Sequence, residues 1–283
     1  IQAWGGGNTA ARAFYKLKTQ YPEDYERAIS KVVMYNIWYQ DGAGVYIEKH
    51  HPGVTMLYSA SFKGTWDYHS QKDTYDFIEN HVKNDHGPLG ALYPQDYVSE
   101  GDTPAFLYSI ANGLRNHEDP SYGGWGGRFE KFNKYEKVYV DAAEDGDKKK
   151  SLRRWIKDAN RDFQARMDWC VTENYANANH APNIWIKGKK IDFTVKSGKK
   201  IKLDGSKSSD PDGDEIQFNW WQYKEAGSYN ESVDLQNFGG GKLIFLAPGV
   251  SKPETIHIIL EANDNGNPEL VSYQRFIITV VPS

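Results

Sequence analysis

Three residues in loop-like stretches have side chains suited to acid–base or metal chemistry. Asp102 stands in Gly101-Asp-Thr-Pro104, directly before a predicted helix, where a carboxylate can ligate calcium through hard oxygen atoms. The alternative is that Asp102 only caps that helix. His86 lies in a Gly-Pro loop and is a candidate general acid, because imidazole titrates near neutral pH. It can equally be an idle, solvent-exposed side chain. Glu100 is a second candidate of the same kind.

A glycine-rich loop supplies a tryptophan and an arginine. In Ser121-Tyr-Gly-Gly-Trp-Gly-Gly-Arg128, Trp125 and Arg128 are spaced so that they can form a sugar-stacking platform or a lid over a site. Glycines would give such a loop mobility. The alternative is a tryptophan that anchors a long loop to the domain surface.

Four aspartates near the C-terminal end form a second acidic group. Asp210, Asp212 and Asp214 alternate along Ser209-Asp-Pro-Asp-Gly-Asp214, and Asp264 lies in a later Asn-Asp-Asn-Gly stretch. Clustered aspartates with glycine can bind calcium. We favour the alternative, a pair of polar turns between strands.

Alternating helices and strands must position the candidates of the first part. Residues 1–9 indicate the end of a strand, a glycine turn and the first turn of a helix. The pattern then predicts helices over 9–20, 22–30 and 44–50 and buried strands over 31–38 and 54–60. Such alternation favours a parallel sheet covered on both faces. In these sheets, ligands bind at the carboxyl ends of the strands.

Further along, the sequence predicts helices over 74–82, 103–114 and 151–171, with a long loop over 115–150 and a linker over 172–183. From Ile184 onward, short alternating strands are predicted over 200–204, 216–221, 242–246, 255–260 and 273–280. This spacing predicts an immunoglobulin-like β-sandwich, free of disulfides because Cys170 is the only cysteine. We therefore expect an α/β domain over 1–180 and an all-β domain over 181–283.

Composition narrows the class of partner. A length of 283 residues agrees with about two domains. A net charge of −4 and a pI near 6.1 argue against a nucleic-acid partner. The sequence has no run of apolar residues long enough for a membrane span. Aromatic residues make up 14% of the chain, with 9 Trp, so a carbohydrate partner is a candidate, although most of these rings should pack cores.

The chain resembles the bacterial cellulose-binding proteins in which a nucleoside hydrolase-like domain precedes an Ig-like C-terminal domain. The resemblance rests on six stretches in order, among them Trp4-Gly-Gly-Gly-Asn-Thr9, Glu100-Gly-Asp-Thr-Pro-Ala-Phe-Leu-Tyr108 and Gly123-Gly-Trp-Gly-Gly-Arg-Phe129, with the others at 86–94, 162–169 and 209–214. It implies a partial nucleoside-hydrolase-like, Rossmann-like parallel sheet. The front of that domain, which carries the aspartate cluster of nucleoside hydrolases, is expected to be missing from this chain.

The resemblance also implies roles for single residues. Asp102 corresponds to a calcium ligand, and Asn8 to a residue whose backbone carbonyl touches calcium. Asn36 corresponds to a contact of the sugar hydroxyls, and Asp41 follows in the same loop. Ordinary turn chemistry for Asn8 and a water-facing strand end for Asn36 are the alternatives. The histidine that helps the leaving group in the family is Gly101 here, so His86 is its candidate replacement.

Two functions follow as hypotheses. The first is calcium-dependent hydrolysis of a glycosidic bond, most simply an N-glycosidic one, in the full-length protein; this chain alone is expected to be inactive. The alternative is a non-catalytic protein that binds cellulose or another plant polysaccharide on the hydrolase scaffold. The ligand is then a carbohydrate or a nucleoside. A truncated sheet edge would promote association. The family implies a secreted or periplasmic location.

Overall fold

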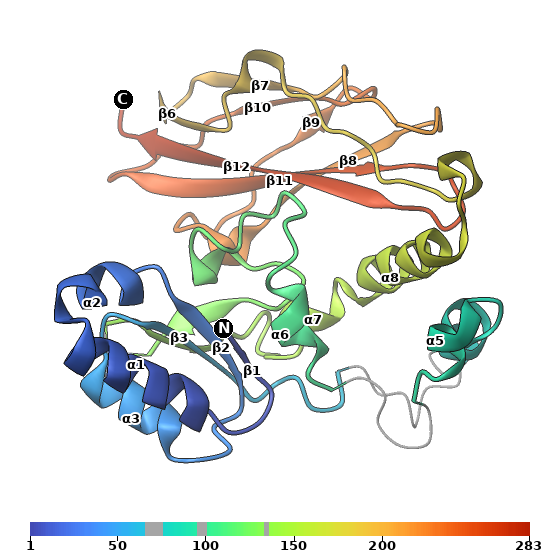
Figure 1. Ribbon diagram of the computed structural model, residues 1–283. Coiled ribbons are helices and arrows are strands. Elements are labelled where there is room, and N and C mark those ends of the chain that lie inside the picture. The colour runs from blue at the N-terminus through green and yellow to red at the C-terminus, as the bar shows by residue number, and fades with distance from the viewer. Residues whose placement is uncertain (66–75, 95–100, 133–135) are drawn as a thin grey trace. The chain divides into compact units, whose positions relative to one another are not determined.

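The computed structural model describes residues 1–65, 76–94, 101–132 and 136–283. The chain forms two compact units (Figure 1). The first unit comprises 1–75, 94–110 and 116–156, and the second comprises 76–93, 111–115 and 157–283. In the described part of the chain, no helix is both long and apolar enough to cross a membrane.

The first unit is built on a five-stranded sheet with the order β1-β2-β3-β5-β4. Its strands are β1 (Gln2–Ala3), β2 (Val33–Ile37), β3 (Thr55–Ser59), β5 (Val138–Asp141) and β4 (Phe129–Lys131). The first four run parallel, and β4 is antiparallel to β5. Parallel pairing places the carboxyl ends of β1, β2, β3 and β5 along one edge, which we call the carboxyl edge.

Helices cover both faces of this sheet, as the alternating pattern predicts. The helices α1 (Asn8–Gln20), α2 (Pro22–Ile29) and α3 (Ala43–His50) lie together on one face (Figure 1). Phe14, Ile29 and Ile47 of these helices pack with Met34 and Met56 of the sheet in one apolar cluster. The short helix α6 (Thr103–Leu107) belongs to a second cluster on the other face.

Several elements differ from their predicted bounds. The predicted loop 115–150 contains β4 and β5, and β5 is an inner strand of the sheet. The predicted helix 103–114 ends at Leu107, where the Ser109 hydroxyl donates to the Phe106 carbonyl and competes with helical hydrogen bonding. In place of one helix over 151–171 there are two, α7 (Lys150–Arg153) and α8 (Ile156–Val171).

The remaining short elements include α5 (Gly87–Ala91), the 3-10 turns η2 (Pro120–Tyr122), η3 (Tyr175–Asn177), η4 (Lys187–Lys189) and η5 (Lys224–Ala226), and the π-helical turn η1 (Glu79–Lys83). The turn η1 overlaps the end of the predicted helix 74–82, whose first two residues lie outside the described residues.

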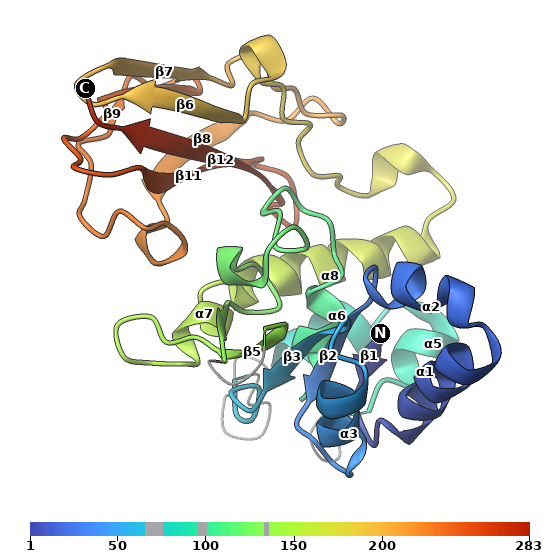
Figure 2. The ribbon, with the colours of Figure 1, turned by 90° about the vertical axis from the view of Figure 1, so that its left-hand side faces the viewer.

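The second unit contains two β-sheets that face each other across one core (Figure 2). One sheet has the order β7-β10-β9, formed by β7 (Lys200–Asp204), β10 (Lys242–Leu246) and β9 (Gln236–Asn237). The other has the order β6-β12-β11-β8, formed by β6 (Asp192–Lys196), β12 (Val271–Val281), β11 (Glu254–Asn263) and β8 (Gln217–Gln222). Pairing is antiparallel except between β6 and β12.

Candidate functional site

The carboxyl edge of the first unit gathers several of the candidate residues. The turn after β1 holds Trp4 and the three glycines Gly5–Gly7, and the turn after β2 runs from Trp38 to Gly42. The Gln40 side chain ties these turns together, since its amide donates to the carbonyls of Trp4 at 3.0 Å and Ile37 at 3.1 Å. The Gln40 hydrogen bonds therefore fix the two turns relative to each other at the carboxyl edge, where polar backbone groups and aromatic rings lie.

Two tryptophans stand out at this edge because they remain exposed. Trp4 and Trp38 directly follow β1 and β2, and each side chain is 48% exposed. Trp38 makes an edge-to-face contact with Phe62, which follows β3, at 6.5 Å between ring centroids. Sequence reasoning did not single out these rings; the signal available was a tryptophan at the end of each of two predicted parallel strands.

The backbone of Trp38 is in a conformation that bulky residues rarely adopt. Its φ is 61°, in the left-handed region, which costs on the order of 1–3 kcal/mol for a non-glycine residue. The Trp38 N–H donates to the Ser59 carbonyl of β3 at 3.0 Å and holds this turn in place. Such an outlier is typical of positions kept for function.

Asp41, predicted to contact substrate, joins two helix N-termini instead. Its carboxylate accepts from the Asn8 N–H at 3.2 Å and from the Ala43 N–H at 2.9 Å, at the starts of α1 and α3. A Cβ on Gly6 would lie 2.3 Å from Asp41 Oδ2, which explains a glycine at that position. The structure thus gives Asp41 a structural role and places Asn8, a predicted metal contact, at the exposed start of α1.

Asn36 is buried within the sheet rather than presented at its edge. Its side chain is 2% exposed, and its amide donates to the carbonyls of Met34 and Leu57, both at 3.0 Å. This arrangement corrects both readings made from the sequence. The side chain faces neither water nor a sugar in this conformation, and its hydrogen bonds connect β2 with β3.

Asp141 is an edge residue that the sequence reasoning missed. Its carboxylate accepts from the N–H groups of Ala60 at 2.7 Å and Ser61 at 2.8 Å and so fixes the turn after β3. Beside it is an open hollow of about 500 Å³. The hollow is lined by Tyr58, Ala60, Ser61, Phe132, Val140, Asp141, Asp147, Lys148 and Lys149. The run Val138-Tyr-Val140 before an aspartate was the available signal for a strand here.

Asp102 immediately precedes α6, as the sequence predicts. Its side chain makes no hydrogen bond to the first turn of that helix, so it does not act as the side-chain cap that was the alternative reading. Partial burial raises the pKa of Asp102 above its usual value. The first turn of α6 thus does not engage this carboxylate, and the neighbouring candidate Glu100 lies outside the described residues.

The glycine-rich loop is packed rather than open. Trp125 is 3% exposed, so its ring offers no free face to a sugar, and the structure supports the anchoring alternative. A Cβ on Gly126 would lie 2.5 Å from Tyr108 Cβ, which shows that the glycine permits close packing. The predicted platform or lid at Trp125 is thus corrected to an anchored loop.

Arg128, predicted to bind substrate, is part of a buried ion cluster. Its guanidinium donates to Glu144 at 3.3 Å and to the Ala143 carbonyl at 2.7 Å. Arg154 donates to the other oxygen of the same carboxylate at 3.0 Å, and Glu144 is fully buried. Because Glu144 already compensates its charge, the Arg128 guanidinium holds the loop in place and is not presented to a ligand.

His86 belongs to the second unit. Its two ring nitrogens lie 2.6 Å from the Asn84 carbonyl and 2.9 Å from Asp168 Oδ1 of α8, and the residue is 9% exposed. It is therefore neither the idle exposed side chain of the alternative reading nor a residue that the structure groups with Asp102. Its hydrogen bonds hold the start of α5 against α8.

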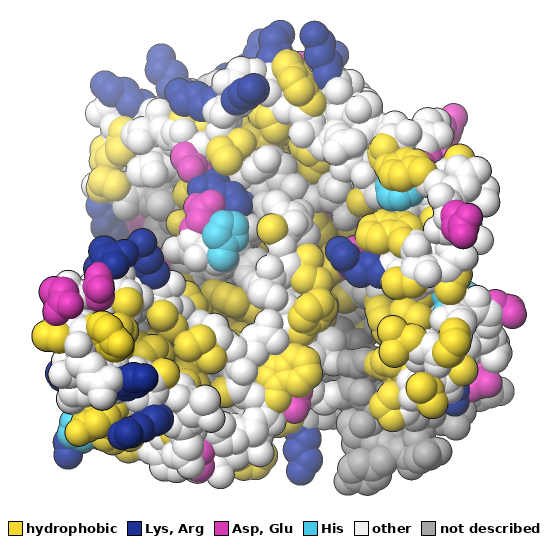
Figure 3. Space-filling model, viewed as in Figure 1, with side chains coloured by type: hydrophobic (Ala, Val, Ile, Leu, Met, Phe, Trp, Pro, Cys, Tyr) yellow, Lys and Arg dark blue, Asp and Glu magenta, His cyan; other side chains and the backbone are white. Residues whose placement is uncertain are grey.

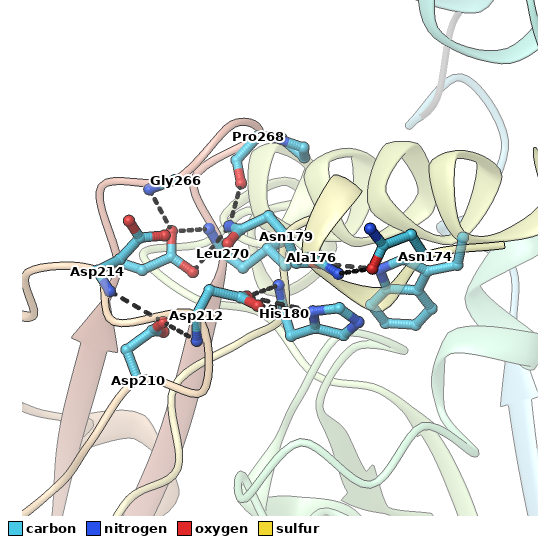
Figure 4. Close-up of polar contacts among 12 residues, drawn as sticks. Asn174, Ala176, Asn179, His180, Asp210, Asp212, Asp214, Gly266, Pro268 and Leu270 are labelled. Atoms are coloured by element: carbon cyan, nitrogen blue, oxygen red, sulfur yellow. Dashed lines mark hydrogen bonds and ion pairs between the residues drawn. The ribbon is translucent and has the colours of Figure 1, made fainter. Parts of the chain in front are cut away.

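Metal-ligating side chains are not clustered within the described residues. Among them no three His, Cys, Asp or Glu side chains are grouped so that they could hold a metal ion. In the acidic group of the second unit, carboxylate oxygens accept from N–H donors (Figure 4), while Asp210 Oδ2 is buried without a hydrogen-bond partner among the described residues. Asp210 accepts from the N–H of Asp212 at 2.8 Å and of Asp214 at 3.2 Å, and Asp264 accepts from Gly266, Leu270 and Asn179. These contacts are typical of polar turns between strands.

Comparison with protein families matches both parts of the chain. Residues 1–129 match the nucleoside hydrolase-like domain of cellulose-binding Sde182, and residues 200–280 match the C-terminal domain of cellulose-binding protein Sde0182. None of the curated proteins matches the chain.

One of the similar solved structures covers the whole chain. It is a nucleoside hydrolase-related hypothetical protein from Saccharophagus degradans, described as associated with carbohydrate metabolism. The match has 33% identity and a TM-score of 0.84, and covers 100% of this chain and 70% of the other.

Two further structures resemble part of the chain. The PKD domain of the KIAA 1837 protein has 22% identity and a TM-score of 0.26, over 35% of this chain and 86% of its own. A mouse clustered PcdhgC3 EC1-3 structure has 15% identity and a TM-score of 0.23, over 36% of this chain and 34% of its own. Scores this low carry no argument about the fold.

Proposed function

Because the chain belongs to the family of cellulose-binding proteins with a nucleoside hydrolase-like domain and a C-terminal domain, we propose that it binds a polysaccharide at its carboxyl edge. The binding surface is the set of exposed rings that follow successive parallel strands, with Trp38 at its centre and Trp4 beside it. A neutral β-linked glucan such as cellulose is the ligand class that the family name suggests.

The chemistry of the rings supports a sugar ligand. A glucan ring has faces of C–H groups that pack on the flat side chain of tryptophan, while its hydroxyls need polar partners at the rim. Exposed aromatic rings are unfavourable in water, and several of them close together on a surface mark an interaction site. The Trp4 and Trp38 turns are also held by the Gln40 amide, so little ordering is needed on binding.

The observation that carries the proposal is Trp38 itself. An exposed tryptophan with a φ of 61° contributes little packing and strains its backbone, yet glycine or asparagine would fit this turn without strain. A large ring kept at such a cost is explained by a ligand that needs it. The hollow beside Asp141, with Lys148 and Lys149 in its lining, supplies charged and polar groups near the turn after β3 for the hydroxyls of the same chain.

The second unit completes this account as a spacer or docking module. We infer that its two facing sheets form an immunoglobulin-like sandwich, which the predicted strand spacing and the single shared core support. Because plant polysaccharides lie outside the bacterial cell, we also propose, from the family, a secreted or periplasmic location.

Calcium-dependent hydrolysis of a glycosidic bond is the second candidate. The observation that favours it is Asp102, whose carboxylate is not engaged as a helix cap. The observation against it is that the described residues hold no group of metal-ligating side chains. Calorimetry with calcium distinguishes the two readings: binding that disappears in Asp102→Ala supports the hydrolase, and heat that is identical in both proteins removes Asp102 from any metal site.

The direct test of the proposed function is depletion of the protein from solution by microcrystalline cellulose. We expect wild type to bind and Trp38→Ala to lose about tenfold in affinity, equivalent to about 1.4 kcal/mol. Trp185→Ala is the matched control, because Trp185 is a partly exposed tryptophan of the second unit at 38%. Equal binding by all three proteins refutes the proposal, as does the absence of binding by wild type.

A further inference from the structure

The outer face of the three-stranded sheet β7-β10-β9 presents lysines in a regular array. Alternate residues of β7 and β10, such as Leu203 and Phe245, point into the core. The residues between them point outward, because successive side chains of a strand alternate between faces. Among these outward residues Lys200, Lys202 and Lys242 are exposed.

The strand register sets apolar side chains beside two of these lysines. Leu246 pairs with Lys200 and Ile244 pairs with Lys202 across β10 and β7. Cβ atoms of directly opposed residues lie about 4.5–5.5 Å apart. Each of these two lysine side chains therefore has an aliphatic side chain beside it on the same face of the sheet. Leu246 is 60% exposed, which leaves it open to a ligand.

Positive charge dominates the sequence around this face. Residues 184–207 contain 8 Lys against 2 Asp, a balance of +6 in a chain whose net charge is −4. One of the two acids, Asp192, is already paired with Arg115 at 2.6 Å. Among the described residues, no salt bridge involves Lys200 or Lys202, whereas Lys242 lies directly opposite the second acid, Asp204, in the strand register. Lys and Arg side chains gather along the top of the view, over β7 and β10 (Figure 3).

We propose that this face binds an acidic polysaccharide, with uronate carboxylates at the ammonium groups of Lys200, Lys202 and Lys242 and sugar C–H faces on Ile244 and Leu246. The inference rests on the proposed function only in taking carbohydrate as the ligand class. Charge complementarity selects a polyanion, and the aliphatic neighbours select one whose repeating units have apolar faces.

The spacing of the array suits a polymer that lies flat on the sheet. Lys200 and Lys202 are two residues apart on one strand, about 6.6–6.8 Å, and β10 lies about 4.7–4.9 Å from β7. Flexible lysine stems can adjust to successive carboxylates over such distances. The outward positions of β7 and β10 carry no arginine, the residue that pairs bidentately with phosphate, so a nucleic acid fits this face less well.

The test is binding to polygalacturonate, a polymer of uronic acid, measured by affinity electrophoresis and by calorimetry at several salt concentrations. We expect wild type to bind and the triple variant Lys200→Gln, Lys202→Gln, Lys242→Gln to lose about tenfold in affinity and most of the salt dependence. The control triple variant Lys16→Gln, Lys31→Gln, Lys49→Gln removes the same charge from exposed positions of the first unit and should bind like wild type.

Leu246→Ser separates the sugar contact from plain charge attraction. It should weaken binding several-fold while the salt dependence stays that of wild type, because no charge is removed. If Leu246→Ser binds like wild type, or if both triple variants lose affinity equally, the proposed site is wrong. Equal affinity for duplex DNA or for vesicles of anionic lipid would show a general polyanion surface and also overturns the assignment.

The Trp38→Ala variant keeps this inference distinct from the proposed function. It should bind polygalacturonate like wild type, because Trp38 belongs to the first unit and the lysine face to the second. If wild type fails to bind cellulose while the lysine triple variant loses polygalacturonate, the proposed function falls and this inference stands. If Trp38→Ala loses both ligands, a separate lysine site is refuted.

Discussion

Three aspartates of the first unit differ in what surrounds their carboxylates. Asp41 and Asp141 each accept two backbone N–H groups and fix the turns around them. The side chain of Asp102 makes no such bond to the helix that it precedes. The same residue type therefore fixes turns at two positions, whereas at the third it does not bond to the helix that follows it.

Asp102 should make stability depend on pH in a defined direction. Burial raises its pKa above the ordinary value of 3.8, so folding disfavours its charged form. The wild type therefore loses stability as the pH rises from 3.8 through the raised pKa. Asp102→Asn has no such penalty, and its Tm should exceed that of wild type at pH 7 and equal it near pH 3. A lower Tm of Asp102→Asn at pH 7 contradicts this account.

At the scale of elements, the buried cluster of Arg128, Glu144 and Arg154 holds the long segment that contains β4 and β5. Glu144→Gln leaves two guanidinium groups without their counter-charge and should destabilise the protein by about 3–5 kcal/mol, measured by urea unfolding. Asp145→Asn is the neighbouring control, because Asp145 forms an exposed ion pair with Lys150 and should cost less than about 1 kcal/mol. Similar losses in both variants would contradict the structural role of Glu144.

The four-stranded sheet of the second unit contains a neutral histidine, His257, which should make the stability of the protein depend on pH. His257 accepts from Arg275 at 3.0 Å, and burial, aided by the charges of Arg275 and Arg115, lowers the pKa of His257 to about 3. In the unfolded chain His257 is protonated below about pH 6.5, whereas in the folded protein it stays neutral down to about pH 3. The free energy of unfolding is therefore highest above pH 6.5 and falls between pH 6.5 and pH 3 by up to about 1.4 kcal/mol per pH unit.

His257→Gln keeps a hydrogen-bond acceptor but cannot be protonated, so it should lack this part of the pH dependence. The measurement is urea unfolding of wild type and variant between pH 3 and pH 8. His50→Gln, at an exposed position of α3, serves as the control and should retain the wild-type slope. Parallel stability curves for His257→Gln and wild type would show that His257 does not contribute as described.

At the scale of the whole molecule, elements with a clear periodicity could be predicted. The strands 200–204 and 242–246 match β7 and β10 because one face of each packs in a core and the other meets water. The inner strand β5 has only the weak signal of Val138-Tyr-Val140, because it is four residues long and a lysine-rich run follows it. Short strands depend on tertiary pairing more than on their own pattern.

The candidate site could be predicted less well than the fold. Sequence reasoning identified the turns after β1 and β2 but chose Asn36 and Asp41, whose hydrogen bonds turn out to connect backbone elements. It overlooked Trp4 and Trp38, because whether a ring is exposed depends on what packs around it and not on its neighbours in sequence. The strain at Trp38 is likewise a property of the folded backbone.

We propose that Trp38 is kept for a polysaccharide at the expense of backbone strain, and the variant Trp38→Asn separates these two properties. Asparagine tolerates the left-handed region, so relief of about 1–3 kcal/mol of strain offsets the loss of the contact with Phe62, worth about 0.5–1.5 kcal/mol. Thermal unfolding and cellulose depletion are measured on the same samples. We expect Trp38→Asn to have an equal or higher Tm and to lose cellulose binding; full cellulose binding by Trp38→Asn would show that the ring is not needed for the ligand.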